Sequence, residues 1–170
     1  LLEDAYLHQR AALVGDRSLG RALPGAPGGT RSAMAAQADQ PEHGTSHISI
    51  ADRFGNTLAM TTTIEAGFGA RLMVNTGAGR SGGFLLNNQL TDFSFTPRDT
   101  QGLPVANRVE PGKRPRSSMS PTLVFDQGTG ELLMSTGSPG GALIIHFTTK
   151  TLLGALGGEL TPQAAIDLPN

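Results

Sequence analysis

The chain has 170 residues and a formal net charge of −1, with 13 Lys and Arg against 14 Asp and Glu. This balance leaves no basic surplus to hold a phosphate backbone, so the composition gives no support for nucleic-acid binding. Cysteine is absent, which excludes disulfides, thiolate catalysis and cysteine-bound metals. No apolar run approaches the ~18–20 residues of a membrane span. The histidines lack the spacing of metal ligands, and we expect neither a metal nor a cofactor; they are His8, His43, His47 and His146.

The first 44 residues predict a helix followed by a linker. Residues 1–15 place apolar side chains at helical spacing, with Gly15 as the expected end. Residues 16–44 are rich in Gly, Pro, Ala and polar residues without periodicity, which is typical of an exposed segment that a protease or self-cleavage can reach. The helical pattern is already under way at Leu1, and the chain stops just after another helical pattern. We therefore expect a piece of a longer polypeptide.

Regular structure is expected from residue 46 onward. Residues 46–52 and 57–64 alternate apolar and polar side chains around a turn at 53–56, which predicts a β-hairpin. Short apolar runs bounded by turn residues predict further strands, separated by a long polar loop. Residues 142–157 predict a helix, and Thr161-Pro162 is a good start for a final one. This order predicts a layered α/β or α+β fold; the further strand runs are 84–86, 122–125 and 132–134, and the loop is 93–116.

Thr45 stands where the linker ends and the first strand begins. Inside a chain, such a threonine is an ordinary residue at the start of a strand. If the Gly44–Thr45 bond were cut, Thr45 would carry a free α-amine, which titrates near ~7.7–8.0 and can act as a base beside the hydroxyl nucleophile. Strand pairing would bring Thr63 near Thr45, where it could hydrogen-bond to that hydroxyl, although threonine is also simply a good strand former.

Three other segments carry groups suited to a small ligand. Residues 85–93 lead two leucines into a cluster of Asn, Gln and Asp, which could grip a polar ligand or form an ordinary turn. Residues 113–121 place two serines beside basic residues, a combination that can bind a carboxylate or form a solvated loop. Residues 136–141 put two glycines directly before a helix, where backbone N–H groups could form an oxyanion hole, although any α/β protein needs such a turn.

Taken together, these segments resemble the γ-glutamyltransferase (γ-glutamyltranspeptidase) family of N-terminal nucleophile hydrolases. The resemblance covers nearly all of residues 45–170. It implies that residues 1–44 are the C-terminal end of the large subunit plus a linker, and that 45–170 are the N-terminal part of the small, catalytic subunit. It also implies an α+β fold, part of a four-layer αββα sandwich. The motifs that carry it, in order, are Thr-Ser-His-Ile-Ser, Asp-x-x-Gly-Asn, Leu-Leu-Asn-Asn-Gln-x-x-Asp-Phe, Lys-Arg-Pro-x-Ser-Ser-Met-Ser-Pro and Gly-Ser-Pro-Gly-Gly.

The same resemblance implies autocatalytic cleavage between Gly44 and Thr45. The Thr45 hydroxyl would then attack glutathione or another γ-glutamyl amide to form a γ-glutamyl ester, which an amino acid, a peptide or water resolves. The implied catalytic residues are Thr45, Thr63, Gly140 and Gly141. The implied substrate-binding residues are Ser117 and Ser118 for the α-carboxylate, and Glu65, Gln89 and Asp92 for the α-ammonium.

Two departures from the family pattern matter. Glu65 stands where the best-known members have Asn, and it could favour another acyl group or alter the pH dependence. The family's carboxylate-clamping arginine belongs to the large subunit, upstream of Leu1, and the C-terminal part of the small subunit is also missing. The four-layer sandwich needs those pieces, so we expect these 170 residues alone to be poorly stable and inactive. The alternatives left open are a related amidase, such as a cephalosporin acylase, and a relative that never matures and only binds its ligand. Family members are commonly exported, which implies a periplasmic or extracellular location.

Overall fold

The computed structural model describes residues 3–27, 34–41, 44–75, 77, 79, 82–157 and 160–169. Leu1, His43 and parts of the predicted linker lie outside these residues. Along the chain the elements are α1 (Asp4–Ala11), β1 (Ser46–Ala51), β2 (Thr57–Thr62), β3 (Met73–Asn75), β4 (Gly83–Leu85), η2 (Gln89–Asp92), β5 (Thr122–Phe125), β6 (Leu132–Thr136), η3 (Gly141–Leu143), α2 (Ile144–Leu156) and α3 (Pro162–Asp167), where η is a 3-10 helix.

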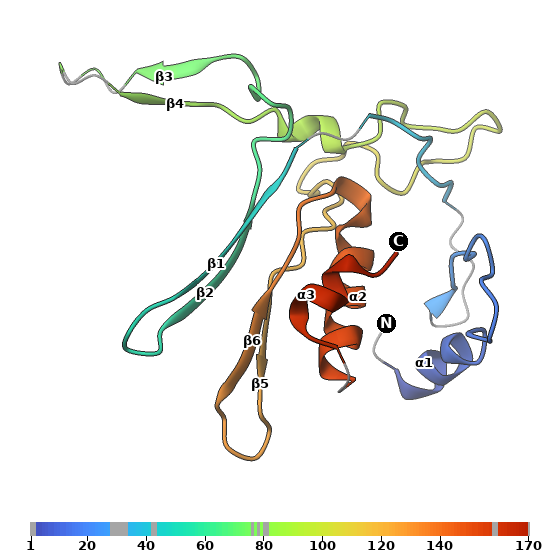
Figure 1. The fold of residues 1–170 in the computed structure, drawn as a ribbon. Helices are drawn as coiled ribbons and strands as arrows, with labels where there is room; N and C mark the ends of the chain where they lie inside the picture. The colour runs from blue at the N-terminus through green and yellow to red at the C-terminus, as the bar shows by residue number, and fades with distance from the viewer. Residues whose placement is uncertain are drawn as a thin grey trace.

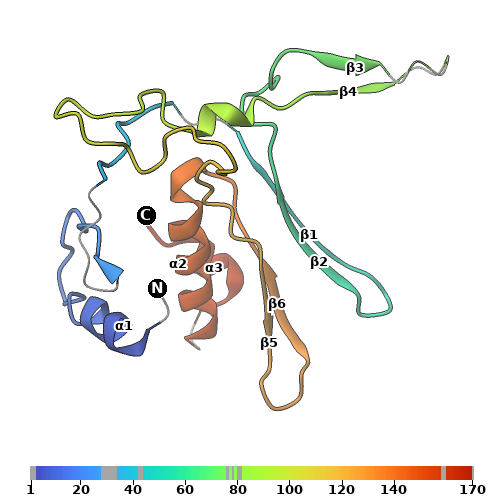
Figure 2. The ribbon, with the colours of Figure 1, turned by 180° about the vertical axis from the view of Figure 1, so that it is seen from behind.

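The strands of the described residues form three antiparallel hairpins, β1–β2, β3–β4 and β5–β6. Ser46 lies opposite Thr62 in the first hairpin, and Thr122 opposite Thr136 in the third. Figure 1 shows β1–β2 and β5–β6 running side by side while β3–β4 projects away, and the view from behind in Figure 2 agrees. This arrangement brings the start of β1 and the segment after β6 to the same end of the molecule.

The elements follow the sequence pattern closely, with two differences. The hairpin predicted at 46–64 is confirmed, and the three later strands lie within two residues of their predicted bounds. The first helix is shorter than predicted: it ends at Ala11 rather than near Gly15, and none of its residues is buried. The strand at Met73–Asn75 is not apparent from the sequence, because three residues are too few to establish an alternating pattern.

An aspartate closes the turn of each of the two longer hairpins. The Asp52 carboxylate accepts hydrogen bonds from the backbone N–H groups of Phe54 and Asn56, at 2.8 and 2.9 Å, and from the Asn56 side chain at 2.7 Å. These bonds hold the pKa of Asp52 below its ordinary value. The bond from the Asn56 side chain contributes most, and the backbone bonds contribute less. Asp126 accepts from the Thr129 N–H at 2.7 Å, and this bond is the main cause of its lowered pKa. A turn closed by such local bonds can be predicted from the sequence.

Helices α2 and α3 pack against each other beside the β5–β6 hairpin (Figure 1). Thr161 caps α3 as predicted, because its hydroxyl accepts a hydrogen bond of 3.2 Å from the Ala164 N–H. Ala165 is fully buried against α2. The two helices approach so closely that a Cβ added to Gly154 would lie 2.8 Å from the Ala165 Cβ. A small residue on each helix therefore permits the contact.

The segment before the first hairpin makes more contacts than the prediction of an exposed linker implies. The backbone of Ala35 forms two hydrogen bonds with residues 104–106. The side-chain amide of Gln40 donates to the carbonyls of Thr91 and Phe93, at 2.8 and 3.0 Å. These bonds attach the segment to the predicted polar loop, which is itself partly buried. The sequence did not predict these contacts, because backbone and side-chain amide groups make them. Such groups produce no apolar periodicity in a sequence.

The apolar core of the described residues is small. Its buried members are Phe93, Val105, Ile144 and Ala165. Large apolar side chains on the hairpins remain exposed, such as Phe84 at 60%. The mixture of helices and antiparallel hairpins is that of the α+β class, whereas the four-layer sandwich stays a prediction. Within the described part of the chain, the helices are too short or too polar to cross a membrane.

We expect the isolated 170-residue chain to lack a cooperative melting transition. Burial of apolar surface is the main favourable contribution to folding, and few apolar side chains are buried. Differential scanning calorimetry should show a broad or absent transition, and an apolar dye should bind strongly. The longer protein is the matched control and should melt sharply. A single sharp transition for the isolated chain would contradict this expectation.

Candidate active site

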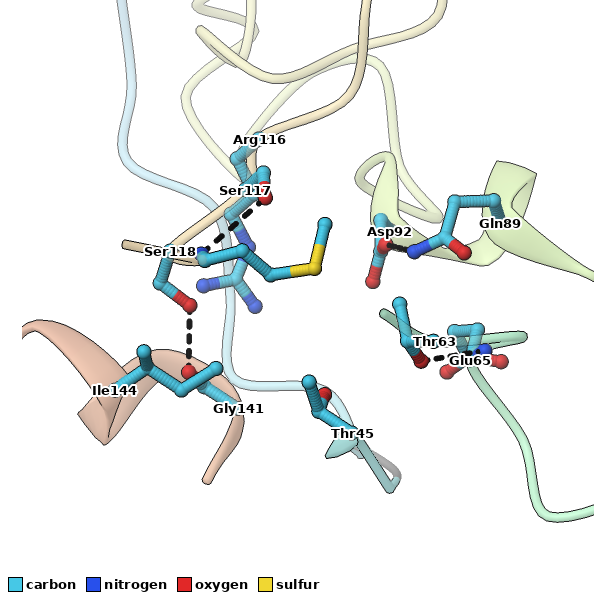
Figure 3. Close-up of a pocket in the computed structure, with 11 residues that line it drawn as sticks. Thr45, Thr63, Glu65, Gln89, Asp92, Arg116, Ser117, Ser118, Gly141 and Ile144 are labelled. Carbon is cyan, nitrogen blue, oxygen red and sulfur yellow. Dashed lines mark hydrogen bonds between the residues drawn. The ribbon is translucent and has the colours of Figure 1, made fainter. Parts of the chain in front are cut away.

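A pocket forms where residues from five parts of the chain converge (Figure 3). Thr45 comes from the start of β1, and other lining residues come from the end of β2, η2, the loop before β5 and the start of α2. Figure 3 shows Glu65 and the η2 side chains on one side, the serine loop and η3 on the other, and Thr45 between them. The lining residues are Thr45, Thr63, Glu65, Gln89, Asp92, Arg116, Ser117, Ser118, Met119, Gly141 and Ile144.

The Gly44–Thr45 peptide borders this pocket through Thr45. The Thr63 hydroxyl donates a hydrogen bond of 2.7 Å to the Gly44 carbonyl oxygen and accepts one of 2.8 Å from the Glu65 N–H. Thr63 thus lies beside the predicted nucleophile, but in the uncut chain its hydroxyl donates to the carbonyl rather than to the Thr45 hydroxyl. A second hollow, lined by residues 44–46, 62–64 and 66–67, reaches the same peptide. A polarised carbonyl that opens onto a hollow is a suitable target for a nucleophile.

One wall of the pocket holds two carboxylates, each with an amide donor. Glu65 has a φ of 72°, which side chains rarely adopt, and it is only 7% exposed. The Asn88 side chain donates to the Glu65 carboxylate and accepts a hydrogen bond of 3.0 Å from the Ala66 N–H. Gln89 donates to the Asp92 carboxylate within η2. Asn88 therefore fixes both the Glu65 side chain and the backbone that follows it.

The facing wall consists of the serine loop and the glycine turn before α2. The Ser118 hydroxyl donates to the Gly141 carbonyl at 2.5 Å, which joins the two segments. Gly140 has a φ of 135°, and a Cβ there would lie 2.6 Å from the Phe147 ring, so the position requires glycine. Backbone N–H groups at a helix start have no partner within the helix and favour anions.

The glycine turn is also supported from β1, by His47, for which the sequence predicts no role at the site. The His47 ring is hydrogen-bonded to the Thr61 hydroxyl at 2.8 Å and to the Ser49 hydroxyl at 3.1 Å. A Cβ added to Gly137 would lie 2.3 Å from that ring. The alternation along β1 predicts on which face of the strand His47 lies. Its contact with the glycine turn could not be predicted, because it depends on how the β1–β2 and β5–β6 hairpins pack.

Eight of the nine predicted site residues line the pocket, and Gly140 lies directly before the lining residue Gly141. The roles assigned to them remain predictions. Arg116, Met119 and Ile144 line the pocket as well. Arg116 is one of the basic residues noted beside the serine pair, whereas no sequence pattern selects Met119 or Ile144. The signal for Arg116 was its place directly before the serine pair. Among the described residues, His, Cys, Asp and Glu form no group of three or more that could hold a metal ion.

Comparisons with known proteins show which family the chain matches. The model of the family described as Gamma-glutamyltranspeptidase matches residues 1–170. The glutathione hydrolase proenzyme of Bacillus subtilis (strain 168) is 40% identical over 142 residues, which cover 81% of this chain and 22% of that protein. The glutathione hydrolase proenzyme of Escherichia coli (strain K12) is 41% identical over 129 residues, which cover 74% of this chain and 21% of that protein. The chain thus spans about a fifth of the length of these curated relatives.

A solved structure shows the same likeness in three dimensions. The gamma-glutamyltranspeptidase from Pseudomonas nitroreducens, complexed with L-DON, matches with a TM-score of 0.57 at 35% identity, over 72% of this chain and 62% of that chain. The family match extends over every residue, and the fold agrees over most of them. The chain therefore belongs to the gamma-glutamyltranspeptidase family.

Proposed function

We propose that this chain holds the processing junction and much of the catalytic site of a self-cleaving γ-glutamyltransferase. Residues 1–44 would end the large subunit, and residues 45–170 would begin the small one. The observation that carries the proposal is the hydrogen bond of 2.7 Å from Thr63 to the Gly44 carbonyl. It lies at the peptide bond that must break to expose the Thr45 amine. The description of both relatives as glutathione hydrolase proenzymes supports the same interpretation.

In the precursor, the Thr45 hydroxyl attacks the Gly44 carbonyl carbon. The C–N bond breaks as the Thr45 nitrogen takes the hydroxyl proton, and the Gly44 acyl group passes to the Thr45 oxygen as an ester. Thr45 thereby gains a free α-amine. The Thr63 hydroxyl stabilises the negative charge that develops on the Gly44 oxygen. Water, which can enter through the second hollow, hydrolyses the ester. Gly44 leaves as a carboxylate, and the Thr45 hydroxyl is restored beside its free α-amine.

In the mature protein, the Thr45 amine accepts the proton of its own hydroxyl, and an amine that titrates near ~7.7–8.0 suits that role. The oxygen attacks the γ-carbonyl of the donor, and the N–H groups of Gly140 and Gly141 stabilise the oxyanion. The departing amine takes the proton from the Thr45 ammonium, which leaves a γ-glutamyl ester. An amino acid, a peptide or water then attacks this ester and restores the hydroxyl.

The pocket fits the α-amino acid head of a γ-glutamyl group, as found in glutathione. Glu65 and Asp92 offer carboxylates to the α-ammonium, with Gln89 beside them, while Ser117 and Ser118 offer hydroxyls to the α-carboxylate. The glutaryl side chain of a cephalosporin has no ammonium. It would therefore make no charge-assisted hydrogen bond to the carboxylates of the pocket, and would bind less tightly than a γ-glutamyl donor. This chemistry favours γ-glutamyl donors over the acylase alternative.

Two measurements separate the candidate functions. The whole matured protein should turn over γ-glutamyl-p-nitroanilide and show little activity on a glutaryl-cephalosporin; the reverse preference would indicate an acylase. Mass spectrometry of the whole protein separates an enzyme from an unprocessed binding relative. A fragment that begins at Thr45 supports the enzyme, and a chain that stays uncut contradicts it.

We also propose that the rest of the protein covers the hairpin faces and completes a four-layer αββα sandwich. The exposed apolar side chains on the hairpins support this, since Ile50, Phe84 and Phe125 each have more than half of their surface exposed, at 53%, 60% and 55%. The remainder of the large subunit would then be a structural partner of this chain. By family resemblance alone, we propose that the protein acts in the periplasm or outside the cell.

Substitution Thr45→Ala should abolish both processing and turnover, because it removes the nucleophile for both steps. N-terminal sequencing of the whole protein and the γ-glutamyl-p-nitroanilide assay measure the two effects. Thr45→Ser is the matched control and should still be cut, since it keeps a hydroxyl beside the scissile bond. If the alanine variant is still cleaved after Gly44, the assignment of the nucleophile is wrong.

Substitution Thr63→Ala should slow processing about 10-fold or more, because it removes the hydrogen bond to the Gly44 carbonyl, where charge develops. The rate is measured by gel densitometry of the purified precursor over time. Thr63→Ser keeps the hydroxyl and should process at close to the normal rate. Equal rates for the alanine variant and the unmodified protein would exclude this role for Thr63.

Substitution Gly140→Ala should lower kcat about 100-fold. The added Cβ would lie 2.6 Å from the Phe147 ring in a conformation with φ of 135°, so the turn must shift and misplace its N–H groups. Steady-state kinetics on the matured protein measure the effect. Gly128→Ala is the control, since its Cβ would make only an ordinary contact at 3.4 Å from Asp126. An unchanged kcat in the Gly140 variant would argue against this oxyanion hole.

A further inference from the structure

The proposed function leaves one cation in the pocket without a role. Arg116 lies directly before Ser117 and Ser118, and it alone is basic among the described residues that line the pocket. Figure 3 shows its side chain running from the serine loop into the pocket, across from Asp92. A guanidinium keeps its positive charge throughout the physiological pH range. One side of the pocket therefore carries a permanent positive charge, and the other side carries carboxylates.

A single amide links these two sides through their backbones. The Asn107 side-chain oxygen accepts a hydrogen bond of 3.0 Å from the Arg116 N–H, and its amide nitrogen donates to the Asp92 carbonyl at 2.7 Å. The same nitrogen donates to the Gln37 side chain at 2.6 Å. Asn107 thus sets the backbone spacing between the basic and the acidic side. Fixed spacing of this kind is what recognition of two opposite charges on one small molecule requires.

The head of an α-amino acid carries an ammonium and a carboxylate on one carbon atom. Serine hydroxyls offer only neutral hydrogen bonds to the carboxylate, while the nearby Glu65 and Asp92 side chains repel it. A guanidinium offsets that repulsion, and its planar fork can bind a carboxylate through two parallel hydrogen bonds. Arg116 supplies this group at the start of the serine pair.

We propose that Arg116 binds the α-carboxylate of the γ-glutamyl donor together with Ser117 and Ser118, and so selects donors in which that carboxylate is free. This inference rests on the proposed function and deepens it. The chain then carries a cationic anchor of its own, distinct from the arginine that the family resemblance assigns to the large subunit. Arg116 is a specificity-determining residue in this scheme, and the Thr45 chemistry does not use it.

The test compares two donors in the whole matured protein. One is γ-glutamyl-p-nitroanilide, and the other is its analogue in which a neutral carboxamide replaces the α-carboxylate. Arg116→Gln should raise KM for the acid donor about 10- to 100-fold, the loss expected for a hydrogen bond to a charged group. Its kcat should change little, and its kcat/KM for the carboxamide donor should stay the same. Arg116→Lys keeps the charge without the planar fork, so its KM for the acid donor should lie between those of the unmodified protein and Arg116→Gln.

Arg114→Gln is the matched control, because Arg114 lies on the same loop but does not line the pocket. Its KM for the acid donor should not change; a rise equal to that of Arg116→Gln would indicate a general effect of loop charge and overturn the proposal. If Arg116→Gln lowers kcat/KM for glutathione but not for γ-glutamyl-p-nitroanilide, the guanidinium contacts the leaving group rather than the α-carboxylate. That result would also overturn the proposal.

Processing of each variant is checked by gel. If Arg116→Gln stays uncut, the comparison uses Arg116→Lys, for which a KM raised several-fold for the acid donor alone supports the proposal and an unchanged KM contradicts it. The failure of the proposed function looks different from the failure of this inference. An inactive unmodified protein contradicts the function itself, whereas an active protein that is insensitive to Arg116 contradicts only the anchor.

Discussion

The hydrogen bond from the Thr63 hydroxyl to the Gly44 carbonyl is the contact on which the rest of the site depends. It fixes the peptide bond at the mouth of the first hairpin. The bond is possible because Ser46 pairs with Thr62, which places the residues just outside the two strands beside each other. The Glu65 N–H donates to the same hydroxyl, so the hydroxyl oxygen is held from two sides. The register of the first hairpin therefore determines where the proposed scissile bond lies.

Features fixed by local bonds could be predicted from the sequence. The first hairpin alternates over two full strands, and Asp52 closes its turn with hydrogen bonds to residues no more than four positions away. The final helix begins where Thr161 caps it. The pocket residues were predictable for another reason, since five ordered motifs together resemble one family. Their convergence in space depends on hydrogen bonds between distant segments.

Features that depend on packing between distant segments could not be predicted. Nothing in the sequence indicates that Glu65 adopts a positive φ, because that conformation rests on the Asn88 side chain 23 residues away. The link from Asn107 to Asp92 spans 15 residues and leaves no periodic trace. The direction of the Arg116 side chain likewise depends on a loop whose path is set by such bonds.

The geometry of the pocket therefore depends more on side-chain amides and hydroxyls than on the apolar core. Asn88, Asn107 and Ser118 each join segments that are separate in sequence. Asn88 supports the wall with the carboxylates, Ser118 supports the facing wall, and Asn107 links the two. Single hydrogen bonds contribute only about 0.5–1.5 kcal/mol each to stability, and so they can orient groups without making the fold stable. Stability must come from apolar burial, which the described residues largely lack. Accurate positioning and a stable fold thus have separate sources in this chain, which is why the pocket can be held by hydrogen bonds while the neighbouring hairpins keep exposed apolar faces.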